Sequence, residues 1–245
     1  YIWVVGEDQE LHFKQLFAIL ELLEEKKEQF FHLPYGMIYL PSGQMSSREG
    51  NVVLADDLMD MVKKAVEKIM KDHKELTTEE KQQVSNMVSV GAIKFSMLKV
   101  APQTDIIFDI NKSVALKGDS GPYIQYSYAR AKSVLRNAQY DYDVDLPHSD
   151  AHPQSISGDL EKEERALLQK IEHFETIVSE TAESLHPNIL ATYLLEVSSL
   201  FNLFYQKYPI IKSEKTQLRL ALTCAVAIIL KQGLYLLGIE SPERM

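Results

Sequence analysis

The feature that most constrains the fold is a series of long helical patterns in the C-terminal part of the chain. Apolar residues recur there every three to four positions, which is the spacing of one buried helix face. The pattern covers three stretches, at about 159–182, 187–206 and 214–237. Pro187 suits the first turn of the second stretch, where its missing N–H is not needed. We therefore expect this part to fold as an all-α bundle.

The start of the chain has a different pattern. Residues 1–6 are a short apolar run, residues 10–25 have helical spacing, and residues 36–40 are a second apolar run. Strand, helix and strand in this order predict a βαβ unit, in which ligands lie beyond the carboxyl ends of the strands. We therefore expect the two segments that follow the strands, 6–9 and 41–51, at that rim.

Further elements are expected between these parts. Helical spacing predicts helices at about 54–75, 78–98 and 123–138. Thr77 and Glu80 have the spacing of a capping box at the start of the second of them. Residues 106–108 form a short strand or extended connector, and the acidic, Pro- and Ser-containing segment 140–158 predicts an exposed linker.

The composition is that of a soluble globular protein, with 245 residues of which 45% are hydrophobic and 25% charged. Cys224 is the single cysteine, so no intramolecular disulfide is possible and a reducing, cytoplasmic location is expected. The longest apolar stretch, 218–230, is shorter than the ~20 residues of a membrane span, so we interpret it as a buried helix. Tyr1 begins a predicted strand without an initiator Met, which favours a longer parent polypeptide.

The net charge of −9 counts against indiscriminate nucleic-acid binding, which depends on Lys and Arg neutralising phosphates. A local basic patch can still act in an acidic protein, because exposed charges are screened over ~10 Å. The candidates are close in sequence: Lys94, Lys99, Lys117, Arg130, Lys132 and Arg136.

One loop has the composition of a phosphate-binding segment. Gly43 and Gly50 can act as hinges, Ser46 and Ser47 can donate hydrogen bonds, and Arg48 supplies a positive charge. Phosphate-binding loops use these features. The alternative is a plain surface turn.

A second motif combines aromatic and basic residues. Tyr123, Tyr126 and Arg130 fall on one face of a predicted helix, and such a set can stack RNA bases on rings and on a guanidinium plane. The alternative is a helix with tyrosines in the core and a solvated arginine. Segment 141–152 imitates the start of a calcium loop but lacks the required Gly and terminal Glu, so we predict no metal site.

These motifs resemble those of the arginyl-tRNA synthetases, which are class I aminoacyl-tRNA synthetases. The similar strings are VVGEDQELHF (4–13), GQMSSREGNVV (43–53), GDSGPYIQYSYARAKSVLR (118–136), FNLFYQKYP (201–209), LRLAL (218–222) and LYLLGIESPERM (234–245). They occur in the same order as in the family and extend over essentially the whole chain. The resemblance implies a mainly α fold, in which the C-terminal piece of a Rossmann-like α/β catalytic domain precedes an all-α bundle of the DALR type. It divides the chain into a catalytic remnant (1–55), a helical connecting region (56–117) and an anticodon-binding domain (118–245).

The resemblance implies roles for residues near the active site. The family's KMSKS loop, which closes over ATP phosphates, corresponds here to Met45, Ser46, Ser47 and Arg48. Gln44 stands where the family usually has Lys, which leaves Arg48 as the cation of the loop. The other implied arginine- and ATP-binding residues are Gly6, Gln9 and His12. From the string alone, the alternative is that Gln9 caps the following helix and His12 lies on its face.

The resemblance also implies tRNA contacts, at Tyr123, Tyr126, Arg130, Asn202, Tyr205, Arg219 and Met245. Ser120 replaces a family Thr, and Gln217 precedes Leu218-Arg219 where the family has Ala.

The implied function is attachment of arginine to its tRNA with ATP. The implied partners are tRNA, arginine and ATP, with magnesium, no membrane and a monomeric state. No His in the chain begins an H-x-G-H string, the other class I signature, so we expect these residues alone to be inactive. Two alternatives stay open: a stand-alone tRNA-binding module without activity, and a helical scaffold with a decayed site.

Overall fold

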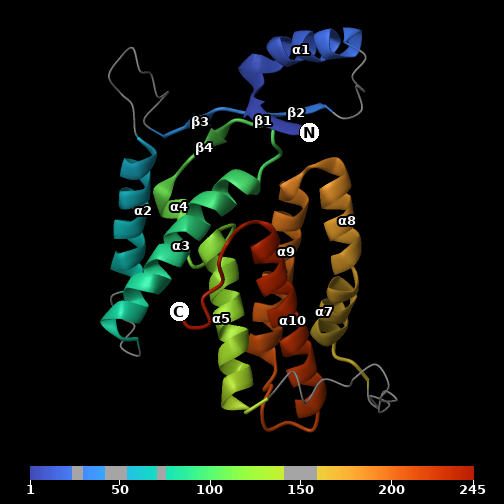
Figure 1. Cartoon of the computed structure of the whole chain (residues 1–245). Helices are drawn as coiled ribbons and strands as arrows, with labels where there is room; N and C mark the ends of the chain where they lie inside the picture. Colours follow the sequence, from blue (N-terminus) through green and yellow to red (C-terminus); the bar gives the residue numbers. More distant parts are fainter. Residues whose placement is uncertain (24–29, 42–53, 71–75, 141–158) are drawn as a thin grey trace.

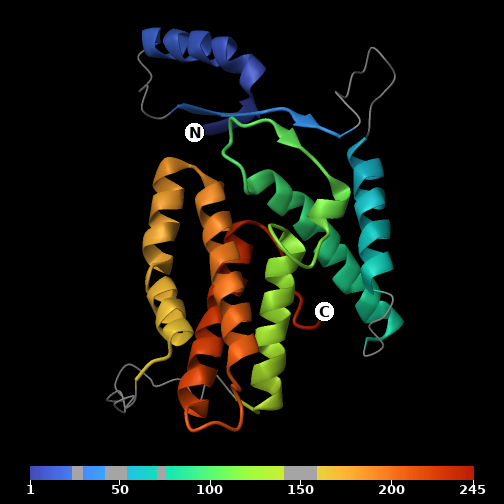
Figure 2. The ribbon, with the colours of Figure 1, turned by 180° about the vertical axis from the view of Figure 1, so that it is seen from behind.

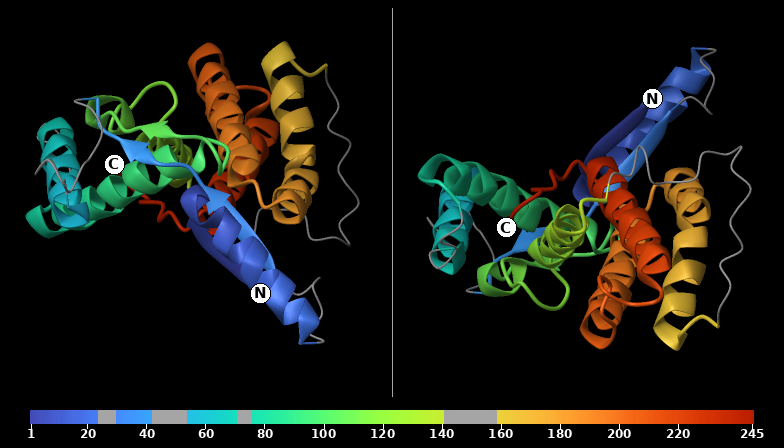
Figure 3. Two further views of the ribbon diagram at one scale, coloured as in Figure 1. Left: turned by 90° about the horizontal axis from the view of Figure 1, so that it is seen from above. Right: turned by 90° about the horizontal axis from the view of Figure 1, so that it is seen from below.

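The computed structural model describes residues 1–23, 30–41, 54–70, 76–140 and 159–245. Its elements form three parts (Figure 1). A small α/β unit lies at the N-terminus, the helices α2 (Ala55–Met70) and α3 (Thr78–Leu98) follow it, and the later helices, from α5 (Gly121–Asn137) onward, form a bundle. Viewed from above, the α/β unit projects away from the bundle, and the C-terminus lies near α3 (Figure 3).

The α/β unit is the predicted βαβ arrangement, with a shift in its second strand. Its elements are β1 (Ile2–Gly6), the 3-10 turn η1 (Glu7–Gln9), α1 (Glu10–Leu22) and β2 (Phe31–Tyr35). β1 and β2 pair in parallel, with Val4 opposite Leu33. Trp3 packs against Phe13 and Phe17, with ring centroids 6.1 and 5.5 Å away.

The strand predicted at 36–40 is short. Only β3 (Ile38–Tyr39) forms there, and it pairs in parallel with β4 (Ile106–Ile107) rather than with β1. The predicted strand or connector at 106–108 is therefore a short strand. Gly36 is required at this crossing, because a Cβ on it would lie 2.5 Å from the backbone of Thr104.

Helices α2 (Ala55–Met70) and α3 (Thr78–Leu98) lie side by side, and the short helix α4 (Ile110–Ser113) packs on both. Their shared core consists mainly of valines: Val62, Val66, Val84, Val88 and Val114. The predicted capping box is confirmed. Thr77 Oγ1 accepts a hydrogen bond from the Glu80 N–H, and the Glu80 carboxylate accepts one from the Thr77 N–H.

The bundle is formed by α5 (Gly121–Asn137), α7 (Lys162–Glu172), α8 (Phe174–Ser184), α9 (Pro187–Lys207) and α10 (Thr216–Leu236). Seen from behind, α9 lies between α5 and the α7–α8 pair (Figure 2). The single helix predicted at 159–182 is wrong, because the chain breaks between α7 and α8 at His173. Gly91 and Gly121 let α3 and α5 approach closely, since a Cβ on Gly121 would lie 2.6 Å from the Gly91 carbonyl oxygen.

Helix α10 is the central helix of the bundle. Of the helices in the described parts of the chain, it alone is long and apolar enough to cross a membrane. Its most apolar window is 61% buried, and it packs on α5, α7 and α9. The sequence prediction of a buried core helix is confirmed.

Candidate nucleic-acid interface

An open pocket of about 510 Å³ lies between α5, α9 and the C-terminal tail. The residues that matter for its chemistry are three arginines, two tyrosines and the terminal methionine: Arg130, Arg136, Arg244, Tyr126, Tyr205 and Met245. No Asp or Glu is among the described residues that line it. The pocket is therefore cationic and aromatic within an acidic chain.

Arg130 is the centre of this pocket. Its guanidinium carbon lies 4.6 Å from the Tyr126 ring centroid and 5.0 Å from that of Tyr205. It donates hydrogen bonds to Asn202 Oδ1 and to the Tyr126 hydroxyl, the latter at 3.0 Å. An arginine has five N–H donors in a planar fork, so donors remain for a ligand after these bonds. The two rings and the amide fix the direction of the fork.

Asn202 acts from behind the pocket. It is only 7% exposed, and its Nδ2 donates to Ser127 Oγ at 2.8 Å, so the side-chain amide cannot turn without breaking a buried bond. Tyr123 is placed elsewhere. Its hydroxyl lies 3.4 Å from Ser199 Oγ on α9, and it does not line the pocket. Four of the sequence-predicted residues thus line one pocket, with Asn202 supporting them.

The C-terminal tail forms one wall of the pocket. Gly238 ends α10 with a φ of +68°, which turns the chain back along α5. The tail is then held by side chains that donate to its carbonyl oxygens: Gln125 to Glu240 at 2.7 Å and Arg136 to Glu243 at 3.1 Å. Met245 packs against the core between α2 and α3. Arg244, which sequence reasoning missed, is exposed beside it.

The remaining basic candidates are largely committed to the protein itself. Lys94 donates to the Gly238 carbonyl, and Lys99 donates to that of Asp119 at 2.8 Å. Lys132 forms an ion pair with Glu243 at 3.6 Å. These lysines hold the tail and a loop, whereas Arg130 faces the pocket and Arg136 both lines the pocket and binds the tail.

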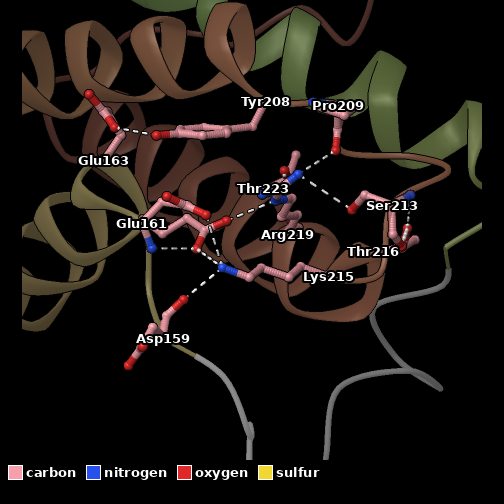
Figure 4. Close-up of polar contacts among 11 residues, drawn as sticks. Asp159, Glu161, Glu163, Tyr208, Pro209, Ser213, Lys215, Thr216, Arg219 and Thr223 are labelled. Carbon is pink, nitrogen blue, oxygen red and sulfur yellow. Dashed lines mark hydrogen bonds and ion pairs between the residues drawn. The ribbon is translucent and has the colours of Figure 1, made fainter.

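Arg219, also named from the sequence, lies in a different environment (Figure 4). It is 6% exposed, its Nε donates to Glu164 at 2.8 Å, and its Nη1 donates to the Pro209 carbonyl at 2.8 Å. Its guanidinium also covers the Tyr208 ring, 5.0 Å from the centroid. Its Nε and Nη1 are bonded within the bundle and the side chain is buried, so the structure does not bring Arg219 to the pocket.

The same network links α7 to the end of α9. The Glu163 carboxylate accepts from Lys207 Nζ and, at 2.7 Å, from the Tyr208 hydroxyl. These two bonds lower the pKa of Glu163 to about 2. The bond to Glu163, followed by burial, raises the pKa of Tyr208 to about 12. Sequence reasoning missed this network, because its members come from three separate helices.

The predicted catalytic rim is only partly described. Gly6 ends β1 and is buried, as expected for the rim. Gln9 and His12 are exposed just beyond it; Gln9 precedes α1 without a side-chain cap and donates to Asp8 at 3.0 Å. The loop residues Gln44, Met45, Ser46, Ser47 and Arg48 lie outside the described residues. In the described parts, no group of His, Cys, Asp and Glu is arranged to hold a metal ion.

Two family models match the chain. Residues 1–110 match the catalytic domain of the class I (R) tRNA synthetases, and residues 124–245 match the DALR anticodon-binding domain. Together they include the α/β unit, the α2–α3 pair and most of the bundle. The chain therefore has the domain order of a class I aminoacyl-tRNA synthetase with a DALR anticodon-binding domain.

Individual relatives show which member of this class the chain resembles. The chain is 39% identical to the arginine–tRNA ligase of Porphyromonas gingivalis and 40% identical to that of Parabacteroides distasonis, in each case over its whole length. It superposes on the Thermus thermophilus arginyl-tRNA synthetase over its whole length, with a TM-score of 0.85 and 32% identity. The chain belongs to the arginyl-tRNA synthetase family. It spans 41% of the length of each of these relatives.

Proposed function

We propose that this chain supplies the anticodon-reading bundle and the ATP-closing loop of an arginine–tRNA ligase, with tRNA, arginine and ATP as partners. The observation that carries the proposal is the Arg130 cluster, where one oriented guanidinium is bounded by two tyrosine rings in an open, cationic pocket. We infer the same division of the chain as from the sequence: 1–55, 56–117 and 118–245.

The cluster has the chemistry of a single-stranded RNA site. A loop base can stack on Tyr205, whose side chain is 41% exposed. The free N–H groups of Arg130 can then donate to acceptors on the base edge, and a bidentate contact of this kind discriminates between bases. Arg136 and Arg244, which line the same pocket, would neutralise the adjoining phosphates. Asn202 holds Arg130 in position and need not touch the RNA.

Tyr123, Arg219 and Met245 take different parts in this proposal. Met245 lines the pocket as an apolar wall and can contact a base through its side chain. Tyr123 would contact RNA only outside this pocket. Arg219 would have to leave Glu164 to reach RNA, so we assign it to the stability of the bundle.

For the catalytic step, we propose that Met45, Ser46, Ser47 and Arg48, with Gln44 before them, close over the ATP phosphates. Gly6, Gln9 and His12 would lie at the arginine and ATP side of the same rim. Magnesium would accompany ATP as its counter-ion. This class of reaction depends on positioning and on stabilisation of developing charge, so the chain needs to supply no general base. We also propose a cytoplasmic, monomeric enzyme.

The test is Tyr205→Ala, measured by titration of arginine tRNA. Loss of a stacking ring costs about 1–3 kcal/mol per base, so the dissociation constant should rise at least fivefold or so. Leu203→Ala is the matched control, because Leu203 lies on the same helix, is also 41% exposed and is absent from the pocket. Equal effects of the two substitutions would show that the pocket does not bind the RNA.

A further inference from the structure

A second pocket lies on another face of α5, in the groove between α5 and α10. Its volume is about 400 Å³, within the range of small-molecule sites in proteins. Tyr128, Lys132 and Leu135 contribute from α5, whereas the pocket at Arg130 uses Tyr126 and Arg130 of the same helix. The two pockets therefore open on different sides of α5.

The interior of this pocket is apolar. Leu135, Ala227 and Cys224 form its floor, with 4%, 5% and 1% of their surfaces exposed. Ile228 and Tyr235 of α10 stand higher on its walls and are 46% and 72% exposed. Exposed apolar side chains around a concave apolar floor are typical of a ligand site, since a soluble helix otherwise places polar residues on its outer face.

The charges at the mouth have one sign. Lys132 and Lys231 line the pocket, and no acidic residue does among the described residues. Lys231 is exposed. Lys132 is paired with Glu243 at 3.6 Å and its side chain is only 21% exposed, so Lys231 supplies the positive charge that is open to a ligand. This exposed positive charge occurs in a chain with a net charge of −9.

The shape and the charges together define the class of ligand. Apolar walls disfavour a fully polar molecule, and the exposed ammonium group of Lys231 disfavours a cation. We propose that the α5–α10 groove binds a small amphipathic anion, with an aromatic or aliphatic body against Leu135, Ala227 and Ile228 and a carboxylate or sulfonate at Lys231. This goes beyond the proposed function and does not depend on it.

The probe for the test is anilinonaphthalene sulfonate, an aromatic anion that fluoresces in apolar sites. Its neutral counterpart, N-phenylnaphthylamine, has the same rings without the sulfonate. The proposal predicts saturable binding of the anion to the intact chain and weaker binding of the neutral compound. Equal affinities would contradict it, because Lys231 would then not select for the anion.

Two substitutions locate the site. Lys231→Glu should weaken binding of the anion roughly tenfold, the order of one charge-assisted contact. Lys162→Glu, at an exposed residue at the start of α7, makes the same charge change elsewhere and should have no effect. Ile228→Asp should abolish binding, and Leu203→Asp is its control at similar exposure. Circular dichroism of each variant confirms that the bundle is folded. Unchanged binding in both groove variants would overturn the proposal.

Cys224 gives a readout that needs no substitution. It is the only cysteine, and burial raises the pKa of its thiol, so it should be alkylated slowly by iodoacetamide. A ligand on the pocket floor should slow alkylation further, with the same midpoint as the fluorescence titration. A rate that stays constant at saturating probe would place the anion elsewhere. A short single-stranded oligoribonucleotide could instead displace the probe, with loss of both the probe fluorescence and the protection of Cys224. That result would assign the groove to RNA and contradict the small-anion proposal.

Discussion

Replacing Arg219 by Met separates a role in stability from a role in RNA binding. Glu164 has no exposed side-chain surface and receives Arg219 Nε at 2.8 Å. Removing one partner of a buried ion pair costs about 3–5 kcal/mol, because the other charge stays buried. Glu164 would keep the Glu161 N–H at 2.9 Å and Lys215 at 3.7 Å. We therefore expect the lower end, a loss of about 3 kcal/mol in the free energy of unfolding.

The pH dependence checks the cause of this loss. In the intact protein, burial raises the pKa of Glu164, but the Glu161 N–H and the Arg219 guanidinium outweigh it and hold the pKa below its ordinary value. The pair therefore stabilises the fold above roughly pH 4.3, and this is lost as the pH falls further. Without Arg219, two of the interactions that lower the pKa of Glu164 are lost, so its pKa rises from the value in the intact protein. The stabilisation that the intact protein gains above roughly pH 4.3 is then reduced, so the deficit of the variant is greater at neutral pH than in mild acid.

The assay is urea unfolding followed by circular dichroism, with RNA titration under conditions where the variant is folded. Arg165→Met, on the exposed side of α7, is the matched control and should change little. Adding Glu164→Leu to Arg219→Met should restore most of the stability, since it removes the unpaired charge. Normal unfolding of Arg219→Met combined with weak RNA binding would refute this reasoning and restore Arg219 as an RNA contact.

Three further outcomes are expected. Glu163→Gln should reduce the loss of unfolding free energy between roughly pH 4.3 and 2. The lowered pKa of Glu163 stabilises the intact protein above that range, and this stabilisation is lost as the pH falls through it. An unchanged pH dependence in acid unfolding would exclude Glu163 as its cause. In the parent enzyme, Arg48→Ala should raise the activation free energy of adenylate formation by about 3 kcal/mol while leaving arginine binding intact. A change in the arginine Michaelis constant alone would argue against a phosphate contact. A polypeptide limited to these 245 residues should catalyse no ATP–pyrophosphate exchange with arginine, with or without tRNA, and turnover above a heat-inactivated control would disprove this.

Much of the fold follows from local sequence signals. Apolar spacing predicts α9 and α10, and the Thr77–Glu80 pair predicts the start of α3. The break at His173 leaves no such signal, because helical spacing continues from α7 into α8. β2 escapes prediction because Pro34 interrupts the pattern of a strand, and the pairing of β3 with β4 depends on residues 68 positions apart.

The candidate site likewise has features that the sequence predicts and features that only the folded chain shows. The spacing of Tyr126 and Arg130 on one helix can be seen in the sequence, but their contact with Tyr205 on α9 is tertiary. For Arg219, the helical pattern reveals a charge near a helix start but not Glu164, its partner 55 positions earlier. A charged residue is usually exposed unless it is paired, and the pairing is visible only in the folded chain.

The most direct test of the account is whether the bundle reads the anticodon through the Arg130 cluster. The measurement is the affinity of the chain for arginine tRNA and for the same tRNA with a changed central anticodon base, at moderate salt where non-specific contacts are weak. The account predicts tighter binding of the unchanged tRNA by about 1–3 kcal/mol, the value of one bidentate base contact. It also predicts that Arg130→Lys abolishes the difference, because an ammonium lacks the planar fork. Equal affinity of the intact chain for the two RNAs would contradict it.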